Sequence, residues 1–160
     1  RSDLKGSQHP WCIVLSCADS RVVPELVFDT GIGELFVIRV AGNIANTETI
    51  ASIEYAVANI PESLVIVVLG HESCGAVTAA LTEADNGHNL NMLLAQILPA
   101  KVACGDGCGV NDVVKKNAEL VAKELVSRSS IIEGALAKDA KGLVIKPAYY
   151  ELESGKVTFL

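Results

Sequence analysis

The chain has 160 residues, of which 50% are apolar and 20% are charged, and its net charge is −6 at pH 7. This composition excludes a disordered chain, and the length suits one domain around a single core. The negative charge disfavours nucleic-acid binding, and no apolar run is long enough to cross a membrane, so neither a nucleic acid nor a membrane is an expected partner. Because no targeting segment is visible, we expect a cytoplasmic location or an organelle stroma or matrix.

Apolar runs of strand length alternate with helix-compatible segments along the chain. The expected elements, in chain order, are a strand at Trp11–Cys17, a short helix at Val23–Phe28, a strand at Leu35–Val40, a helix at Thr47–Asn59, a strand at Leu64–Leu69, helices at Ala76–Glu83, Leu90–Val102 (bent or ended by Pro99), Val110–Ser127 and Ser130 to about Ala137, and a terminal hairpin of Leu143–Glu151 and Lys156–Leu160. This alternation predicts an α/β fold, with a mostly parallel central sheet flanked by helices and an antiparallel C-terminal edge strand. No repeat or linker divides the chain, so we expect a single domain over residues 1–160.

Three side chains that bind metals well follow two of these strands. Cys17 ends the apolar run WCIVLSC, and His71 and Cys74 come just after the run LVIVVLG. In an α/β fold the carboxyl ends of adjacent parallel strands are where ligands bind. Two thiolates and one imidazole suit Zn²⁺, and three protein ligands leave a fourth position for water, as in catalytic rather than structural zinc sites. These three residues are therefore the predicted ligands of one zinc ion.

An acidic and a basic residue follow the first of these ligands in the run CADSR. Asp19 lies two residues beyond Cys17, within reach of the metal, and Arg21 can hold its carboxylate in a bidentate pair. Two roles are open for this carboxylate: it accepts a hydrogen bond from metal-bound water, or it becomes the fourth ligand and closes the site. An ordinary turn with a surface ion pair is the simpler alternative for such a triplet.

The remaining cysteines are not expected to bind this metal. Their odd total of five does not indicate a secreted disulfide framework, so a reducing compartment is expected. Cys12 falls inside the first strand and is interpreted as a small buried apolar residue. Cys104 and Cys108 lie in the Gly-rich segment ACGDGCGV, where few other ligands flank them. A redox pair and a second metal site are the two minor alternatives for them.

Together these motifs resemble the β-class carbonic anhydrases. The resemblance rests on CADSRV (Cys17–Val22), GELFVIRVAGN (Gly33–Asn43), SIEYAV (Ser52–Val57) and GHESCGAV (Gly70–Val77), which occur in the family's order and spacing. The closing segment AYYELESGKV also resembles the family's terminal hairpin, so the resemblance extends from about Gln8 to the end of the chain. Val14 stands where the bicarbonate-regulated branch has tryptophan, so the chain is more similar to the plant-like branch, which is not regulated in this way.

The resemblance implies the residues of the site. It implies one Zn²⁺ per chain on the cysteine and histidine ligands above, with Asp19 and Arg21 as the catalytic pair. The implied substrate-binding residues are Gln8, Phe36, Ala41, Tyr55 and Gly75. In the plant-like branch the glutamine, phenylalanine and tyrosine reach the cleft from a neighbouring subunit, which implies a homodimer or a dimer of dimers. Almost nothing precedes Gln8, so the family's amino-terminal helical arm is expected to be absent, and Val40 replaces a frequent asparagine with little expected effect on the chemistry.

The implied reaction is the reversible hydration of carbon dioxide to bicarbonate and a proton. Zinc lowers the pKa of bound water toward ~7, so zinc-bound hydroxide, oriented by Asp19 and Arg21, would attack the substrate. The apolar members of the pocket suit carbon dioxide, while Gln8 and the Gly75 amide would donate hydrogen bonds to the developing charge. His88 is a candidate proton shuttle, and an exposed loop histidine is the simpler interpretation.

Three other functions stay open on the sequence alone. Carbonyl sulfide or carbon disulfide could be hydrolysed on the same scaffold, since both substrates are isoelectronic with carbon dioxide and pocket shape would decide. A non-catalytic zinc-binding module is a second alternative, although Asp19 and Arg21 argue against it. A thiol-redox module that uses Cys104 and Cys108 is the third.

Overall fold

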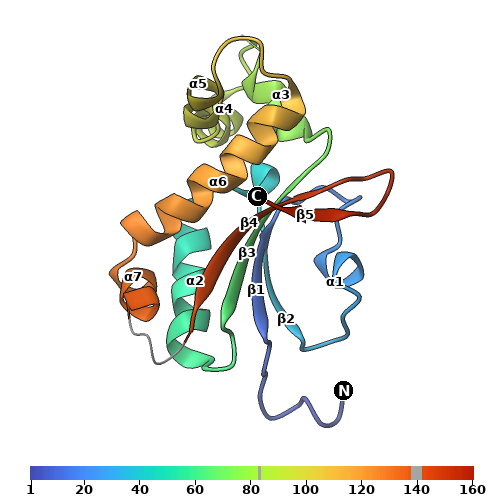
Figure 1. Cartoon of the computed structure of the whole chain (residues 1–160), viewed down its shortest axis with the longest axis vertical. Helices are drawn as coiled ribbons and strands as arrows, with labels where there is room; N and C mark the ends of the chain where they lie inside the picture. Colours follow the sequence, from blue (N-terminus) through green and yellow to red (C-terminus); the bar gives the residue numbers. More distant parts are fainter. Residues whose placement is uncertain (83, 138–141) are drawn as a thin grey trace.

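The apolar runs predicted as strands form one five-stranded sheet in a computed structural model of the chain (Figure 1). The structure describes residues 1–82, 84–137 and 142–160. The strands are β1 (Cys12–Ser16), β2 (Leu35–Arg39), β3 (Val65–His71), β4 (Val144–Tyr150) and β5 (Val157–Phe159). Their order is β2-β1-β3-β4-β5; the first four strands are parallel and β5 is antiparallel to β4. The predicted α/β fold with an antiparallel edge strand is confirmed.

Helices connect the strands and cover the sheet. They are α1 (Pro24–Val27), the 3₁₀ turn η1 (Ala41–Asn43), α2 (Thr47–Asn59), α3 (Gly75–Ala80), α4 (His88–Ala95), α5 (Leu98–Cys104), α6 (Val110–Ser127) and α7 (Ser130–Ala137). In Figure 1, α2, α6 and α7 lie on one side of the sheet, α1 lies on the other, and α3, α4 and α5 lie beyond the carboxyl ends of the parallel strands. The site at that end is therefore enclosed by helices that follow β3.

Most expected boundaries lie within one residue of the observed ones, and three expectations differ by more. The single helix predicted at Leu90–Val102 is wrong: two helices, α4 and α5, occupy this stretch, and Pro99 lies in the first turn of α5. Proline is tolerated there because the first-turn amides of a helix need no intrahelical acceptor, whereas inside a helix its ring breaks the hydrogen-bond ladder. His71 is the last residue of β3 rather than a residue after the strand, and α3 ends at Ala80. The predicted end of that helix, Glu83, lies outside the described residues.

The two faces of the sheet carry separate apolar clusters, because alternate side chains of a strand point in opposite directions. On the face toward α2 and α6 the buried strand residues are Ile13, Leu15, Ile66 and Val68. On the face toward α1 and the terminal hairpin they are Cys12, Val14, Val67, Leu69 and Ala148. Cys12 is 1% exposed, and burial raises the pKa of its thiol to about 12, so it stays protonated as an apolar residue. Its predicted role as a small buried side chain is confirmed.

The part of the chain that the structure describes contains no helix with both the length and the apolar character needed to cross a bilayer. This finding agrees with the sequence, in which no run of membrane-spanning length occurs.

Helix α6 approaches the sheet most closely at Gly70 of β3. A Cβ atom on Gly70 would lie 2.8 Å from Cγ1 of Val114 and 3.3 Å from its carbonyl oxygen. Both of these atoms belong to α6, and the carbonyl cannot move without the helix. Glycine at this position therefore sets the distance between α6 and the end of β3.

Replacing Gly70 by alanine should push α6 away from the sheet. We expect Gly70→Ala to lower the free energy of unfolding by about 1–3 kcal/mol, as for other overpacked sites. The matched control is Gly134→Ala in α7, where an added Cβ meets no atom within 4 Å. This control should be neutral or more stable by up to ~1 kcal/mol, because alanine favours helix. Urea unfolding of the two variants measures both effects, and equal stability of Gly70→Ala and the parent would refute the close approach.

Candidate metal centre

The predicted ligands lie at the carboxyl ends of two adjacent strands. Cys17 directly follows β1, His71 ends β3, and Cys74 directly precedes α3. Strands β1 and β3 pair in parallel up to Ser16 and Leu69, which brings the next residues of both strands to the same edge. Strands β1 and β3 are neighbours in the sheet, but the strand that follows β1 in the chain lies on one side of this pair and the strand that follows β3 lies on the other. Ligands of α/β folds bind at the carboxyl ends of two strands related in this way.

The three side chains form a compact and buried cluster. Their ligating atoms all lie within 4.8 Å of one another, and the two sulfurs of Cys17 and Cys74 are 4.0 Å apart. Tetrahedral Zn²⁺ with Zn–S bonds of ~2.3 Å would place two sulfurs ~3.8 Å apart. Cys17, His71 and Cys74 are 4%, 0% and 1% exposed, respectively. The cluster therefore has the donor set and spacing of a metal site, and no other such group occurs within residues 1–82, 84–137 and 142–160.

The imidazole of His71 is oriented for a ligand. Its Nδ1 lies 2.9 Å from the carbonyl oxygen of Glu72, which can only accept, so Nδ1 carries the proton and Nε2 carries a lone pair. Among the described residues Nε2 has no hydrogen-bond partner, although it is fully buried. A buried acceptor without a partner is unfavourable, and a metal ion would satisfy it.

The surroundings of Cys17 lower the pKa of its thiol. The Cys74 thiol and the backbone amide of Gly42 contact its sulfur and lower the pKa of Cys17, against the opposing effect of burial. The Gly42 amide donates to this sulfur over 3.3 Å. Because the thiolate is the form that binds metals, these contacts favour coordination.

Asp19 and Arg21 form a bidentate pair at the edge of the cluster. The Nε and Nη2 atoms of Arg21 donate to Oδ1 and Oδ2 of Asp19 over 2.9 Å and 2.7 Å, and the Arg21 amide donates to Oδ1. The Arg21 guanidinium lowers the pKa of Asp19 below its usual range, so the carboxylate is ionised. Its Oδ2 lies 3.8 Å from Nε2 of His71. A negative oxygen thus faces the cluster while both carboxylate oxygens stay bound to the arginine.

A second arginine, which is not among the predicted site residues, holds the backbone of the same turn. Arg39, the last residue of β2, donates from Nε to the carbonyl of Cys17 over 3.1 Å and from Nη2 to the carbonyl of Asp19 over 2.7 Å. The parallel register places Arg39 opposite Ser16, one residue before Cys17, and this pairing is visible only in the folded chain. Arg39 therefore supports both a metal-binding and an acidic residue without contacting the cluster's ligating atoms.

Two asparagines of α6 hold the other loops around the cluster. Asn117, 2% exposed, donates to the carbonyl of Gly42 over 2.9 Å, next to the amide that contacts Cys17. Asn111 accepts from the Ser73 amide over 2.9 Å, one residue before Cys74. Neither role follows from the helical pattern of the segment, since an asparagine in an amphipathic helix is ordinarily on its solvent side.

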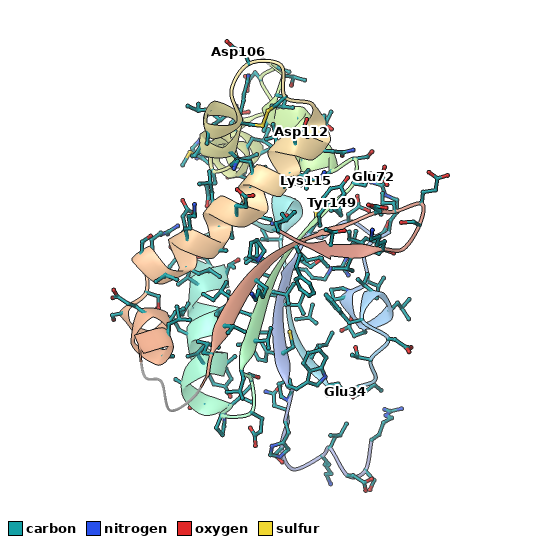
Figure 2. All side chains as sticks on the ribbon, viewed as in Figure 1. Glu34, Glu72, Asp106, Asp112, Lys115 and Tyr149 are labelled. Atoms are coloured by element: carbon teal, nitrogen blue, oxygen red, sulfur yellow. A yellow bond between two sulfur atoms is a disulfide. The ribbon has the colours of Figure 1, made fainter. Side chains whose placement is uncertain are left out.

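The terminal hairpin is tied to the same edge of the sheet through Glu72. The Glu72 amide donates to the carbonyl of Tyr150, and its carboxylate accepts from the Leu152 amide over 2.9 Å. Figure 2 shows Glu72, Asp112, Lys115 and Tyr149 close together where α6 passes β4. The ammonium of Lys115 lies 4.7 Å from the ring centre of Tyr149. Burial and the nearby carboxylates raise the pKa of Tyr149, so this phenol stays neutral.

The predicted substrate-binding residues fall into two groups. Ala41 and Gly75 adjoin the cluster, since Gly42 contacts Cys17 and Gly75 follows Cys74. Phe36 and Tyr55 lie together, with ring centres 6.3 Å apart, but Phe36 is paired with Ile13 near the start of β1. At ~3.3 Å per residue this is ~10 Å or more from the end of the strand.

Gln8 is exposed in the segment before β1, at the same end of the sheet as Phe36 and Tyr55. Within one chain the structure therefore does not bring the glutamine and the two aromatic residues to the cluster.

Two further expectations are settled by the structure. Cys104 and Cys108 are joined by a disulfide, so the alternative of a second metal site is wrong, and a redox role for the pair stays a prediction. Their short spacing allows the bond because α5 ends at Cys104 and the chain turns at once toward α6. His88 is exposed, as in the simpler interpretation, but it begins α4 instead of lying in a loop.

Known proteins share this sequence and fold. A family model described as carbonic anhydrase matches residues 12–157. Carbonic anhydrase 2 of Mycobacterium tuberculosis is 36% identical over 165 residues, which cover 98% of this chain and 77% of the relative. The carbonic anhydrase of Mycolicibacterium smegmatis is also 36% identical, over 98% of this chain and 78% of the relative.

Solved structures give the same result. A β-carbonic anhydrase of Sordaria macrospora, described as tetrameric, superposes with a TM-score of 0.89 at 26% identity and covers 99% of this chain and 84% of its own. The Coccomyxa β-carbonic anhydrase in complex with acetazolamide has a TM-score of 0.89 at 28% identity, with 99% of this chain and 75% of its own covered. The agreement extends over the ligand cluster and the terminal hairpin alike, and the chain belongs to the β-carbonic anhydrase family.

Proposed function

We propose that this chain catalyses the reversible hydration of carbon dioxide to bicarbonate and a proton, with one Zn²⁺ held by Cys17, His71 and Cys74. The observation that carries the proposal is the buried Nε2 of His71, which faces two thiols and has no partner among the described residues. Membership of the family bears out the assignment to carbonic anhydrases made from the motifs. No observation in the structure favours carbonyl sulfide or carbon disulfide as the substrate instead.

The ion would supply Lewis-acid chemistry, which makes water acidic enough to lose a proton near neutral pH. Asp19 would act on the attacking water: its carboxylate is ionised and can only accept a hydrogen bond, so it favours a nucleophile that still carries a proton and fixes its orientation. Arg21 would keep Asp19 ionised and in place through two hydrogen bonds. In the alternative role of Asp19 as a fourth ligand, its Oδ2, which now accepts one hydrogen bond from Arg21, would turn a further lone pair to the metal.

The substrate would bind beside the cluster. Ala41 offers an apolar surface, and the Gly75 amide at the start of α3 would donate to an oxygen of the substrate as negative charge develops there. Gln8, Phe36 and Tyr55 would complete this pocket from a second copy of the chain, since within one chain they lie at the other end of the sheet. Tyr55 is 54% exposed, which leaves much of its ring free to contact another subunit.

A homodimer is therefore proposed as the minimum working unit, and a dimer of dimers is the larger form. The Sordaria macrospora relative, described as tetrameric, supports assembly of this fold. We also propose the plant-like branch for this chain: Val14 is fully buried at the position of the branch-specific tryptophan. The cellular compartment stays a prediction.

The metal ligands can be tested by removing one thiol. We expect Cys74→Ser to lose most of its zinc, because a serine hydroxyl does not ionise at neutral pH and cannot replace the thiolate. Cys12→Ser is the matched control: this cysteine is also buried, but it lies outside the cluster and should leave the zinc content unchanged. Metal analysis of the folded variants by mass spectrometry measures both. Stoichiometric zinc in Cys74→Ser would contradict the ligand assignment.

The role of Asp19 can be separated from metal binding. Asp19→Ala should keep its zinc but hydrate carbon dioxide about 10²-fold more slowly or worse near neutral pH, the usual scale for loss of an acid–base group. Asp106→Ala, which removes an exposed carboxylate between α5 and α6, is the control and should keep full activity. Stopped-flow hydration assays give the rates, and an Asp19→Ala enzyme as fast as the parent would remove this residue from the mechanism.

The shared pocket can be tested on the exposed aromatic residue of α2. Tyr55→Arg places a charge where a second copy is proposed to pack, so we expect monomers, retained zinc and loss of most of the activity. The control is Met92→Arg, at an apolar residue of α4 that is 60% exposed. It should leave the oligomeric state, the zinc content and the activity unchanged. Sedimentation velocity and hydration rates are the measurements. Monomeric Tyr55→Arg with full activity would show that one chain forms a complete site.

A further inference from the structure

A disulfide joins the end of α5 to the start of α6, the helix that supports the metal cluster. Cys104 is the last residue of α5, and Cys108 comes just before Gly109, the cap of α6. The three residues between them, Gly-Asp-Gly, are exposed, and both cysteines are half-buried. In Figure 2 Asp106 lies at the outer end of the molecule, on the loop between α5 and α6. A soluble thiol can therefore approach this bond without unfolding the sheet.

The first turn of α6 connects this disulfide to the cluster. The carboxylate of Asp112 accepts from the Gly109 amide over 3.0 Å, which fixes the start of the helix one residue after Cys108. In the same turn Asn111 accepts from the Ser73 amide over 2.9 Å. Cys104 and Cys108 also pack against the buried apolar cluster that contains Cys17 and Cys74. The redox site and the metal cluster are thus linked by one helix terminus and by shared packing.

The backbone conformation of Ser73 depends on its contact with Asn111 in the first turn of α6. Its φ is 53°, a left-handed conformation that is unfavourable for a side chain other than glycine or asparagine. Such a conformation persists when surrounding contacts hold it. Asn111 is one of these contacts, and the other is Arg21, which donates to the Ser73 carbonyl over 3.4 Å. Ser73 therefore lies between the first turn of α6, the arginine that holds Asp19, and Cys74.

We propose that Cys104 and Cys108 form a reversible dithiol–disulfide switch, whose state is transmitted through the first turn of α6 to the Asn111–Ser73 contact beside Cys74. In the disulfide form the bond anchors the end of α5 to the start of α6 and holds Asn111 against Ser73. In the dithiol form the loop opens, the first turn of α6 frays, and Ser73 loses this contact. This inference goes beyond the proposed function, because it concerns the support of the cluster and not the reaction.

The chemistry is thiol–disulfide exchange with a protein dithiol of the thioredoxin class. One thiolate of the reductant attacks Sγ of Cys104, which breaks the bond to Cys108 and releases that sulfur as a thiolate at the helix amino terminus, where negative charge is favoured. The second thiol of the reductant, once deprotonated, resolves the mixed disulfide and releases Cys104. The reductant becomes a disulfide, and two electrons and two protons pass to the chain. Glutathione disulfide reverses the process and yields two molecules of glutathione.

A reversible role fits this bond better than a stabilising one. A disulfide stabilises a fold mainly by restricting the unfolded chain, and this effect is smaller for a short closed loop, such as this one with a separation of four residues, than for a long one. Gly105 and Gly107 have φ values of 86° and 90° and no atom within 4 Å of an added Cβ. Both glycines can change conformation freely when the bond breaks, so the loop can open while α5 and the rest of α6 stay packed.

The test measures the Ser73 amide directly. The zinc-loaded protein is equilibrated in glutathione buffers from reducing to oxidising, alkylation and mass spectrometry count the thiols of Cys104 and Cys108, and NMR follows hydrogen exchange of the Ser73 amide. We expect both cysteines to interconvert in the folded protein and Ser73 to exchange about threefold to tenfold faster in the dithiol form, the scale of one weakened hydrogen bond. The same measurement on metal-free protein shows whether the effect depends on the ion.

Three variants complete the experiment. Cys104→Ser/Cys108→Ser should show the fast Ser73 exchange in every buffer, and Asn111→Ala should show it whatever the state of the cysteines. Cys12→Ser, which alters a cysteine outside this pathway, should respond to the buffer as the parent does. Equal Ser73 exchange in the dithiol and disulfide forms overturns the proposal, as does a disulfide that resists reduction until the protein unfolds. Neither outcome bears on carbon dioxide hydration, which the Asp19 and Cys74 variants test separately.

Discussion

Parallel pairing of β1 with β3 is the interaction on which the metal cluster depends. Cys17 and Cys74 are 57 residues apart in the chain, and their sulfurs are brought within 4.0 Å because both strands end at the same edge of the sheet. No local structure can supply this proximity. The strands are buried on both faces and so need continuous apolar sequence, which is why polar and ligating residues can begin only where the strands stop. The same constraint that builds the core thus places the donors at its rim.

Helix α6 supports the cluster from the outside of the sheet. It approaches β3 closely at Gly70, and its two asparagines hold the carbonyl of Gly42 and the amide of Ser73. The loops that follow β2 and β3 therefore both contact α6. The start of this helix is bonded to α5 through the disulfide, which can be oxidised or reduced. A permanent disulfide would not persist in the reducing compartment that the cysteine count predicts. The reversible bond that we propose removes this conflict.

The electrostatics of the cluster come from a small number of short contacts. Arg21 binds both oxygens of Asp19, and Arg39 binds the backbone on either side of the same turn. Two fixed cations thus orient one carboxylate toward a buried group of soft donors. This arrangement keeps the carboxylate ionised and close to the donors, and it leaves the donors themselves available for an ion.

The sequence alone was enough for the fold class, the approximate place of most elements and three candidate ligands that the fold brings together. Thr47–Asn59 and Val110–Ser127 were predicted with the observed bounds, because an amphipathic period and polar ends define a helix locally. Cys17, His71 and Cys74 were recognisable because each follows an apolar run, and the surrounding motifs specified the family. The break between α4 and α5 was missed, since the apolar pattern continues across it and only packing decides where the chain turns.

The tertiary structure alone decided the contacts between distant segments. Arg39, Asn111 and Asn117 support the cluster, and Cys104 bonds to Cys108, yet none of these roles follows from the residue's own surroundings in the chain. Periodicity indicates which face of an element is buried, but it does not indicate which neighbour a polar side chain meets there. The reactive side chains of the site can therefore be identified from the sequence. The contacts that orient them form only in the folded chain, because they join residues far apart in the sequence.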